Sequence, residues 1–361
     1  MEGPATLHGV PNRLLPMQLE LIIPGLSWLA AAPGRHPAHA QPLPALATLL
    51  GFARSRWAEP ASTDALLADA LGLAGAVSHA LLRRSGEPGP SPAGGGHWLC
   101  CDPVHLHFAR DTLLLADASG LAITRQEADT LMAGLNDTFA DIGHFEAPAS
   151  DRWYVHLAEQ PAPRFHPLAD VNGRPVQLFL PEGEDISRWA RLSNEIEVWL
   201  YSHPVNTARE EAGQRKINGI WLWGAGPQQA PCTPRISRLQ ASQPYALGLA
   251  RLAGLTPDTG STYTTPTGPA LALLDTLQRP ALHHDRDAWQ HELLQLETRW
   301  FAPLLADLKA RRLTGVRIRV PDDRHLLEVD IAASGLWKFW RKPQPLDALL
   351  ATAPQPKSST P

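Results

Sequence analysis

The chain has 361 residues, 44% of them hydrophobic and 19% charged, a globular composition with enough apolar material for one large domain or two smaller ones. Its formal net charge of −4 gives no global positive field, so a nucleic-acid partner is not expected. The three cysteines favour a reducing, cytoplasmic compartment over a disulfide framework, and no apolar run reaches the ~18 residues of a membrane span.

The N-terminal part of the chain predicts one strand and a set of helices. Residues 19–23 (LELII) predict a buried strand, which ends at the turn Pro24-Gly25. The apolar stretch 21–33 has the length of a signal-peptide core, but Glu20 at its edge favours the strand. The Ala- and Leu-rich residues 41–84 predict helices.

A Gly- and Pro-rich segment, residues 85–96 (SGEPGPSPAGGG), predicts a loop. It divides an N-terminal part of the α/β core, residues 1–84, from a main α/β region, residues 97–350. The tail, residues 351–361, predicts disorder.

The main region alternates strands with helices. Thr124 and Glu127 form a capping box at the start of a helix that reaches residue 142. Further elements are strands over 97–101, 104–109 and 217–223, helices over 186–202 (capped by Asp185) and 288–311, and a hairpin around 321–323. This alternation predicts an α/β fold with a mostly parallel sheet flanked by helices.

The densest polar region is residues 192–226. It joins the helix over 186–202, a short connection and the apolar strand 217–223, which ends at Gly224-Ala225-Gly226. Ligands in open α/β sheets bind beyond the carboxyl ends of strands, so this block is a candidate ligand site. The candidate ligand-binding residues are Asn194, Asn206, Arg209, Asn218, Trp221, Trp223, Gly224 and Gly226. The acid/base candidates are Glu195, His203 and Glu210.

A structural role explains the same block equally well. Trp221 and Trp223 share one face of the strand and Ile220 and Leu222 the other, as in a sheet covered on both faces. Under this interpretation Asn206 and the other polar side chains of the block satisfy loop backbone or face solvent.

Signals for other chemistry are weak. His105 and His107 lie on one face of a strand, next to Cys100 and Cys101, but no Cys-x-x-Cys pair accompanies them, so no metal or other cofactor is expected. A nucleophile elbow and a phosphate-binding glycine loop are both missing from the sequence.

Several segments resemble a known group of bacterial proteins. They are HWLCCDPVHL, RWYVHL, YALGLARLAGL and the long run from Asn194 to Gly226. Together they are similar to the E-type regulatory proteins of the pathogenicity-factor cluster, which are described as phosphoglycerate mutase-like.

The segment INGIWLWGAG is also similar to a strand-and-glycine segment of the archaeal type of cofactor-independent phosphoglycerate mutase, with Ala225 where that family has Gln. The resemblance implies an alkaline-phosphatase-like fold. Enzymes of that superfamily use two divalent metals and a serine nucleophile, so the resemblance implies these as well. The first metal ligand there is the Asp of an Asp-Gly pair directly after the first strand. Pro24-Gly25 stands there instead.

Three hypotheses follow from these features. The first is a non-catalytic or divergent mutase-like protein with a regulatory or ligand-binding role, whose ligand is small and anionic or sugar-like. The second is a phosphomutase or hydrolase acting on a phosphorylated or sugar-like molecule. The third is a structural partner in a protein complex.

Overall fold

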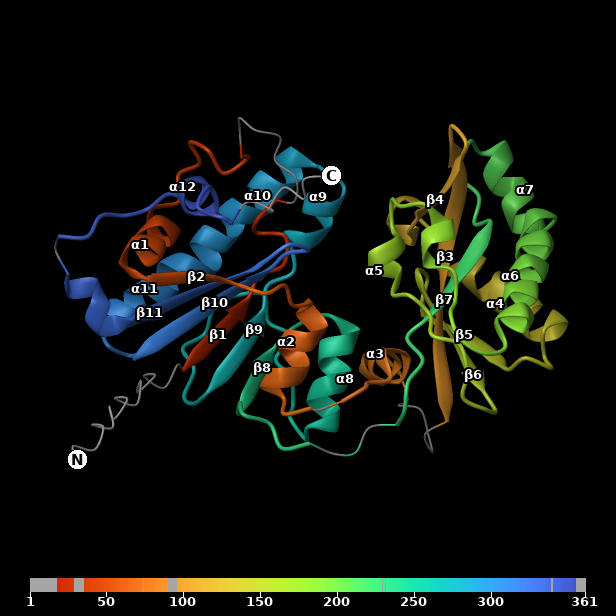
Figure 1. Ribbon diagram of the computed structural model, residues 1–361, viewed down its shortest axis with the longest axis horizontal. Helices are drawn as coiled ribbons and strands as arrows, with labels where there is room; N and C mark the ends of the chain where they lie inside the picture. Colours follow the sequence, from red (N-terminus) through yellow and green to blue (C-terminus); the bar gives the residue numbers. More distant parts are fainter. Residues whose placement is uncertain are drawn as a thin grey trace, which may run out of the picture. The chain divides into compact units, whose positions relative to one another are not determined.

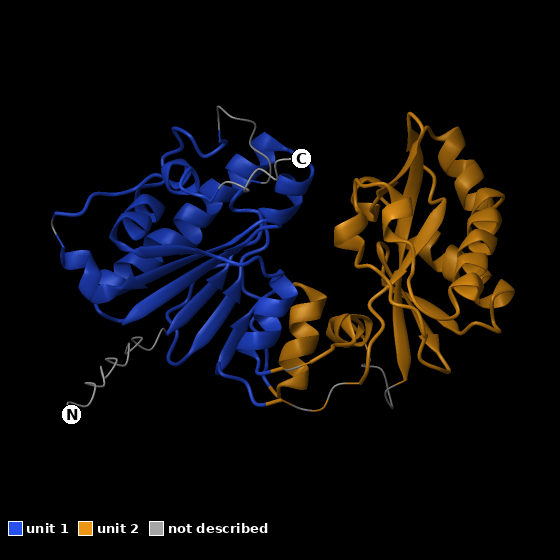
Figure 2. Ribbon diagram, viewed as in Figure 1, with its two compact units in different colours: residues 1–72, 233–242, 255–361 blue, residues 73–232, 243–254 orange. Residues whose placement is uncertain are grey.

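The computed structural model describes residues 18–28, 36–73, 75–89, 96–228, 230, 232–338 and 340–354. The chain divides into two compact units (Figure 2). Unit 1 comprises residues 1–72, 233–242 and 255–361, and unit 2 comprises residues 73–232 and 243–254. This division differs from the predicted one, because each unit is assembled from segments far apart in sequence. None of the helices in the described ranges has the length and apolar character needed to cross a membrane.

Unit 1 is built on a six-stranded sheet in the order β2-β11-β10-β1-β9-β8 (Figure 1). Strands β8, β9, β1 and β10 run parallel, and β11 and β2 add antiparallel strands at one edge. The strands are β1 (Leu19–Ile22), β2 (Arg54–Ala58), β8 (Arg238–Gln240), β9 (Ala270–Leu273), β10 (Gly315–Pro321) and β11 (Leu326–Ala332). The predicted α/β class with a mostly parallel sheet and an added hairpin is confirmed.

Helices cover one face of this sheet. Figure 1 shows α1, α10 and α11 together on one side of it, and their apolar side chains form one core with Leu19, Leu21 and Ile23 of the β1 segment. The helices of unit 1 are α1 (Pro44–Phe52), α2 (Thr63–Ala70), α9 (Gln278–Leu282), α10 (Arg286–Leu296), η3 (Glu297–Phe301), α11 (Ala302–Lys309), η4 (Ala333–Trp337) and α12 (Leu346–Leu350).

The segment predicted as one helix over 288–311 contains a π-helical turn, η3, between α10 and α11. This turn brings the buried Glu297 to the N-terminus of α1, where Leu43 offers no side-chain cap. The Glu297 carboxylate accepts hydrogen bonds from the backbone amides of Ala45 (2.5 Å) and Leu46 (3.0 Å). The first backbone amides of a helix have no acceptor within the helix, and this carboxylate accepts hydrogen bonds from two of them. Its negative charge also complements the helix dipole.

Replacing Glu297 by alanine is therefore expected to lower the free energy of unfolding by about 2 kcal/mol, because two buried amides lose their acceptor. Urea unfolding followed by circular dichroism measures the loss. Glu297→Gln, which keeps one acceptor oxygen, should lose less. Equal stability of the alanine variant and the wild type would contradict this cap.

Unit 2 is built on an antiparallel sheet around one long strand, β3 (His97–Ala109). The sheet order is β4-β3-β6-β5, and β7 also pairs with β3. The remaining strands are β4 (Thr112–Ala116), β5 (His144–Ala149), β6 (Arg152–Leu157) and β7 (Gly219–Trp223). The two strands predicted on either side of Asp102-Pro103 are thus one continuous strand. Asp102 and Pro103 themselves pair with residues of β7.

Helices α4 and α6 of unit 2 pack against this sheet. Helix α4 contacts β5 and α6 contacts β7, and their apolar side chains are buried there. The capping box of Thr124 and Glu127 is confirmed, whereas Asp185 precedes α6 in a left-handed conformation and makes no side-chain cap. The helices are α3 (His79–Gly86), η1 (Ala118–Gly120), α4 (Arg125–Thr138), α5 (Leu168–Val171), η2 (Val176–Phe179), α6 (Ile186–Tyr201), α7 (Pro204–Glu211) and α8 (Pro244–Leu252).

Helix α3 packs closely on α8, which comes from a distant part of the sequence. Two glycines make this contact close. A Cβ on Gly86 would lie 1.7 Å from the carbonyl oxygen of Pro244, and one on Gly248 would lie 1.8 Å from that of Leu82. The crossing explains why α8 belongs to unit 2 although it is inserted between β8 and β9 of unit 1.

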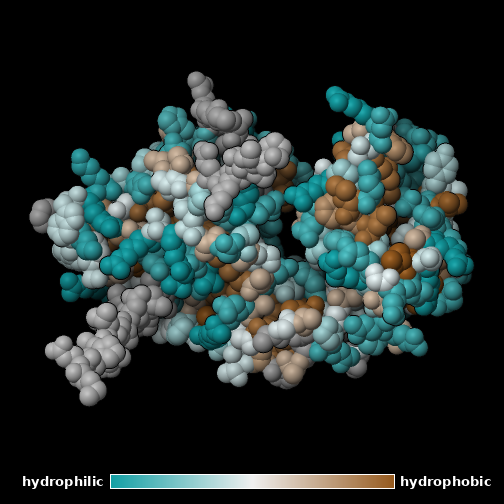
Figure 3. Space-filling model, viewed as in Figure 1, coloured by the Kyte–Doolittle hydropathy of each residue, from teal (hydrophilic) through white to brown (hydrophobic). Residues whose placement is uncertain are grey.

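Unit 2 also exposes apolar side chains. Figure 3 shows them gathered on its surface over α5 and β4. The exposed large apolar residues of this part of the chain include Phe108, Leu178 and Leu180. Exposed apolar side chains that gather in this way mark surfaces suited to a partner.

Candidate functional site

Residues 192–226 are the site that the sequence predicts. The acid/base candidates of this block have different surroundings in the structure. Glu195 and Asn194 are exposed on α6. Glu210 is exposed on α7, where its carboxylate pairs with the ammonium of Lys216 at 2.7 Å. His203 caps α7: its Nδ1 accepts a hydrogen bond from the backbone amide of Val205, and burial lowers the pKa of its imidazole.

Asn206 and Arg209 are buried and bonded within the protein. The Asn206 side chain donates to the carbonyl oxygens of Leu200 and Ile217 and accepts from the amide of Ile217. The Arg209 guanidinium donates to the carbonyl oxygens of Leu121 and Arg215 and pairs with Glu127 at 2.8 Å. Both side chains therefore tie α7 and the entry to β7 to neighbouring segments rather than offering donors to a ligand.

The polar atoms of the β7 segment are engaged in the same way. The Asn218 amide pairs with both backbone groups of Leu106 on β3. The indole of Trp221 donates to the carbonyl oxygen of His166, and that of Trp223 donates to the carboxylate of Asp102, each at 2.8 Å. Because β7 pairs antiparallel with β3, the carboxyl-end argument for parallel strands does not apply to it.

Gly224 and Gly226 lie in close backbone contact with the N-terminal side of α3. Gly224 adopts φ = +80°, and its carbonyl oxygen accepts a hydrogen bond from the amide of Ala80 at 2.9 Å. A Cβ on Gly226 would lie 2.6 Å from the carbonyl oxygen of Val77. The glycines thus allow α3 to pack against the end of β7.

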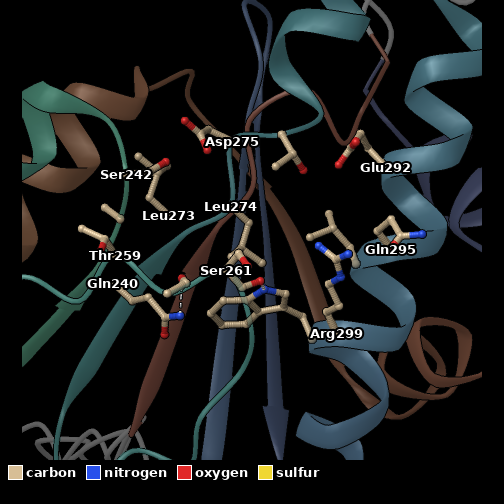
Figure 4. A pocket seen from close by; sticks show the side chains of 15 residues that line it. Gln240, Ser242, Thr259, Ser261, Leu273, Leu274, Asp275, Glu292, Gln295 and Arg299 are labelled. Atoms are coloured by element: carbon tan, nitrogen blue, oxygen red, sulfur yellow. Dashed lines mark hydrogen bonds between the residues drawn. The ribbon is translucent and has the colours of Figure 1, made fainter.

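A pocket lies elsewhere, at the carboxyl ends of the parallel strands β8 and β9 of unit 1 (Figure 4). We call it the edge pocket. Its volume is about 100 Å³. Its lining comes from four segments: the ends of β8 and β9, the loop after α8, and the α10–η3 helix. The lining residues are Gln240, Ala241, Ser242, Thr259, Gly260, Ser261, Leu273, Leu274, Asp275, Thr276, Glu292, Gln295, Leu296, Arg299 and Trp300.

The loop that closes the edge pocket is held from two sides. The Gln240 amide donates to the carbonyl oxygens of Gly260 (2.7 Å) and Thr262 (2.9 Å), and the indole of the buried Trp300 donates to that of Ser261 (3.0 Å). These bonds fix the loop over the sheet edge. In Figure 4 the side chains of Asp275 and Glu292 lie near one rim, and the Arg299 guanidinium extends along the helix wall.

Several polar side chains of the edge pocket have no hydrogen-bond or ion-pair partner among the described residues. They are Ser242, Thr259, Thr276, Glu292, Gln295 and Arg299. This is the reverse of the 192–226 block, whose buried polar side chains are bonded to the protein. Polar groups that converge on a concavity and keep their bonding capacity are the usual mark of a ligand site.

The donor set of the protein does not fit the two metals that the sequence resemblance implies. The described residues contain no group of three or more His, Cys, Asp and Glu side chains placed to hold a metal ion. After β1 the chain has Pro24 and Gly25, and the edge pocket offers only the carboxylates of Asp275 and Glu292. Two closely spaced metals need several more acidic or imidazole ligands.

The cysteines do not supply a nucleophile. Cys100 and Cys101 are fully buried in β3, and burial raises the pKa of both thiols. His107 stacks on His105, which bonds the carbonyl oxygen of Lys216. The two thiols therefore have packing roles, whereas the His107 side chain is exposed.

Sequence reasoning missed the edge pocket. The apolar run of β9 ends in Leu274-Asp275-Thr276, a polar pair directly after a buried strand, and Glu292, Gln295 and Arg299 recur at the spacing of one helix face. Those two signals mark the pocket once β8 and β9 are known to be parallel neighbours.

Comparisons with known proteins give partial matches in sequence. The 2,3-bisphosphoglycerate-independent phosphoglycerate mutase of Methanothrix thermoacetophila is 37% identical over 73 residues, which cover 20% of this chain and 18% of that protein. Phosphoglycerate mutase 2 of the same type from Methanothermobacter thermautotrophicus is 32% identical over 126 residues, which cover 34% of this chain and 31% of that protein.

The chain is similar in sequence to cofactor-independent phosphoglycerate mutases. The match spans less than a third of the length of either curated relative. No family model matches the sequence. The resemblance to bacterial regulatory proteins finds no counterpart among these relatives, whose names are those of mutases.

The similarity in structure extends further along the chain. The PH0037 protein from Pyrococcus horikoshii superposes with a TM-score of 0.50 at 13% sequence identity, covering 88% of this chain and 87% of that one. At this identity the match shows the fold alone.

Proposed function

We propose that this chain is a divergent, non-catalytic protein of the mutase-like fold that binds a small polar molecule in the edge pocket and has a regulatory or ligand-binding role. The supporting observation is a set of six polar side chains that line this pocket without partners among the described residues: Ser242, Thr259, Thr276, Glu292, Gln295 and Arg299. An anionic group of such a molecule would bind the Arg299 guanidinium, and its uncharged polar groups would bind the hydroxyl groups of the lining.

The non-catalytic part of the proposal rests on the donor set. The superfamily's chemistry needs ligands for two metals, and the described residues do not gather them. A regulatory role follows as part of the same proposal, because binding without turnover serves signalling or control. The proposal places the protein in the cytoplasm, which its three free cysteines favour.

A thermal-shift screen of sugar acids, sugar phosphates, amino acids and nucleotides tests this function. We expect at least one compound to raise the melting temperature of the wild type, and the shift to shrink in Arg299→Ala. Lys309→Ala, an exposed cation on α11 outside the pocket, is the matched control and should respond like the wild type. A shift that survives Arg299→Ala but disappears in Arg209→Ala would overturn the assignment to the edge pocket.

The alternative is a phosphomutase or hydrolase of phosphorylated or sugar-like molecules, which the names of the curated relatives favour. Glu195, His203 and Glu210 would be its acid/base candidates. Metal analysis together with an isomerisation assay on 3-phosphoglycerate separates the two. About two Mn, Zn or Mg ions per chain together with turnover, consistent with two-metal chemistry, would support the enzyme and contradict the non-catalytic proposal.

A third candidate is a structural partner in a protein complex. The exposed apolar side chains of Phe108, Leu178 and Leu180 support it. A silent ligand screen, combined with a partner that dissociates when Leu178 and Leu180 are changed to Ser, would favour this role over ligand binding.

A further inference from the structure

The helix wall of the edge pocket carries two opposite charges. Glu292 lies on α10, and Arg299 lies seven residues later on η3. Residues at this spacing lie on one helix face, with Gln295 between them. All three side chains line the pocket, and Figure 4 shows the carboxylate and the guanidinium at different heights along the wall.

These two charges do not neutralise each other. Within the part of the chain that the structure describes, neither Glu292 nor Arg299 takes part in an ion pair. Glu292 is half-buried and Arg299 is exposed, so both charges stay accessible to a ligand. The separation leaves a carboxylate and a guanidinium facing the same small space, each able to bind an opposite charge.

The charge of the lining argues against a phosphorylated ligand. The charged side chains of the edge pocket that have no partner among the described residues are the Glu292 carboxylate and the Arg299 guanidinium. A phosphoryl dianion would meet one anion beside the one cation, and like charges at close range are costly. A ligand with one cationic and one anionic group meets a complementary charge at both ends.

The size of the pocket restricts the ligand further. Its volume of about 100 Å³ is small. Typical sites for drug-sized ligands measure about 300–1,000 Å³. Leu273, Leu274 and Trp300 line part of the wall and give room for a short apolar side chain. The hydroxyls of Ser242 and Thr259 add uncharged polar contacts on the opposite side.

We propose that the edge pocket binds a compact zwitterion of the amino-acid class, with its carboxylate on Arg299 and its ammonium on Glu292. This inference rests on the proposed function, since it names the ligand class of the same site.

Isothermal titration with individual free amino acids tests the proposal, with four control compounds. Glycerate and lactate lack the ammonium, ethanolamine lacks the carboxylate, and inorganic phosphate carries only negative charge. We expect at least one amino acid to bind, and each control to bind at least about tenfold more weakly, because each loses one charge-assisted contact.

Two variants locate the contacts. Glu292→Gln keeps the shape of the side chain and should weaken amino-acid binding about tenfold, and Arg299→Ala should weaken it by as much or more. Glu292→Gln should also improve the relative binding of the hydroxy acids, since the pocket then carries less negative charge. Lys309→Ala should bind like the wild type.

Failure of the ligand class and failure of the site give different results. Tighter binding of phosphate or of a hydroxy acid, still lost in Arg299→Ala, would overturn the zwitterion and leave the edge pocket as a binding site. Failure of every amino acid to bind would also overturn the zwitterion. Amino-acid binding that neither variant changes would overturn both the contacts and the proposed site.

Discussion

Replacing Arg83 by methionine is expected to lower the free energy of unfolding of unit 2 by about 3–5 kcal/mol, because it leaves a buried carboxylate without its counter-charge. Arg83 on α3 donates two hydrogen bonds to Asp102 on β3, at 2.7 and 2.8 Å. Asp102 is 2% exposed and also accepts from the amide of Trp153 and the indole of Trp223. No solvent is available to replace the lost donor.

The surroundings of this pair explain why it is central to unit 2. The Arg83 guanidinium lies 4.6 Å from the ring centroid of Tyr154 and 5.2 Å from that of Trp223, a stacked arrangement that favours the cation. The imidazole of His79 packs on the other side, between Trp223 and Tyr245. One helix, α3, therefore joins β3, β7 and α8 through a single layer of aromatic and charged groups.

Urea unfolding of Arg83→Met, followed by tryptophan fluorescence and circular dichroism, measures this loss. The double variant Arg83→Met/Asp102→Asn is the control. It removes both charges but keeps a side-chain oxygen that can accept from Trp153 or Trp223, so it should recover much of the stability. A loss below about 1 kcal/mol in the single variant would mean that the pair contributes no more than an exposed one.

Replacing Arg209 by alanine is expected to lower the free energy of unfolding by about 2–4 kcal/mol and to leave ligand binding unchanged. Its guanidinium is buried and supplies the donors for the carbonyl oxygens of Leu121 and Arg215 and for Glu127. The substitution leaves these three acceptors without their partner. Arg299→Ala should show the opposite pattern, with little change in stability and a loss of binding.

The stability difference between wild type and Arg209→Ala should depend on pH. Burial raises the pKa of Glu127, but hydrogen bonds from Thr124 and Arg209 outweigh it and hold the pKa below its usual value. A carboxylate whose pKa is lower in the folded than in the unfolded protein stabilises the fold at pH values above its unfolded-state pKa. This stabilisation is lost as the pH falls through its folded-state pKa. The gap between the two proteins should therefore be widest near neutral pH and narrow in acid. A gap that widens in acid would contradict the ion pair.

The sequence indicated much of the local structure, because local structure depends on residues close together in the chain. The capping box of Thr124 and Glu127, the strand beginning at Leu19 and the hairpin around Pro321 are all present. One local expectation was wrong in part. Residues 41–84 were predicted to form helices only, but they include the edge strand β2 (Arg54–Ala58), which pairs antiparallel with β11.

The long-range arrangement could not be predicted in this way. That β7 pairs antiparallel with β3, and that α8 packs on α3, depends on contacts between segments more than a hundred residues apart. The same limit applies to the candidate site. A sequence shows that Asn206 and Arg209 are polar, but not that their side chains already donate to backbone carbonyl oxygens and, for Arg209, to Glu127.

The two tryptophans at the end of β7 illustrate the point. Trp223 packs against Arg83 and His79 and bonds Asp102, and Trp221 bonds a backbone carbonyl. Their place is in the core of unit 2, as the structural interpretation of the sequence had it. The unpartnered polar side chains that line the edge pocket lie in unit 1, on segments that the sequence did not single out as a site.

The most direct test of this account is a crystal structure of the protein soaked with the tightest-binding compound from the screen. The account predicts electron density for that compound at the carboxyl ends of β8 and β9, in contact with Arg299 and Glu292. Density for the compound among Arg209, Asn218 and Trp223 instead, with the edge pocket holding only water, would contradict it.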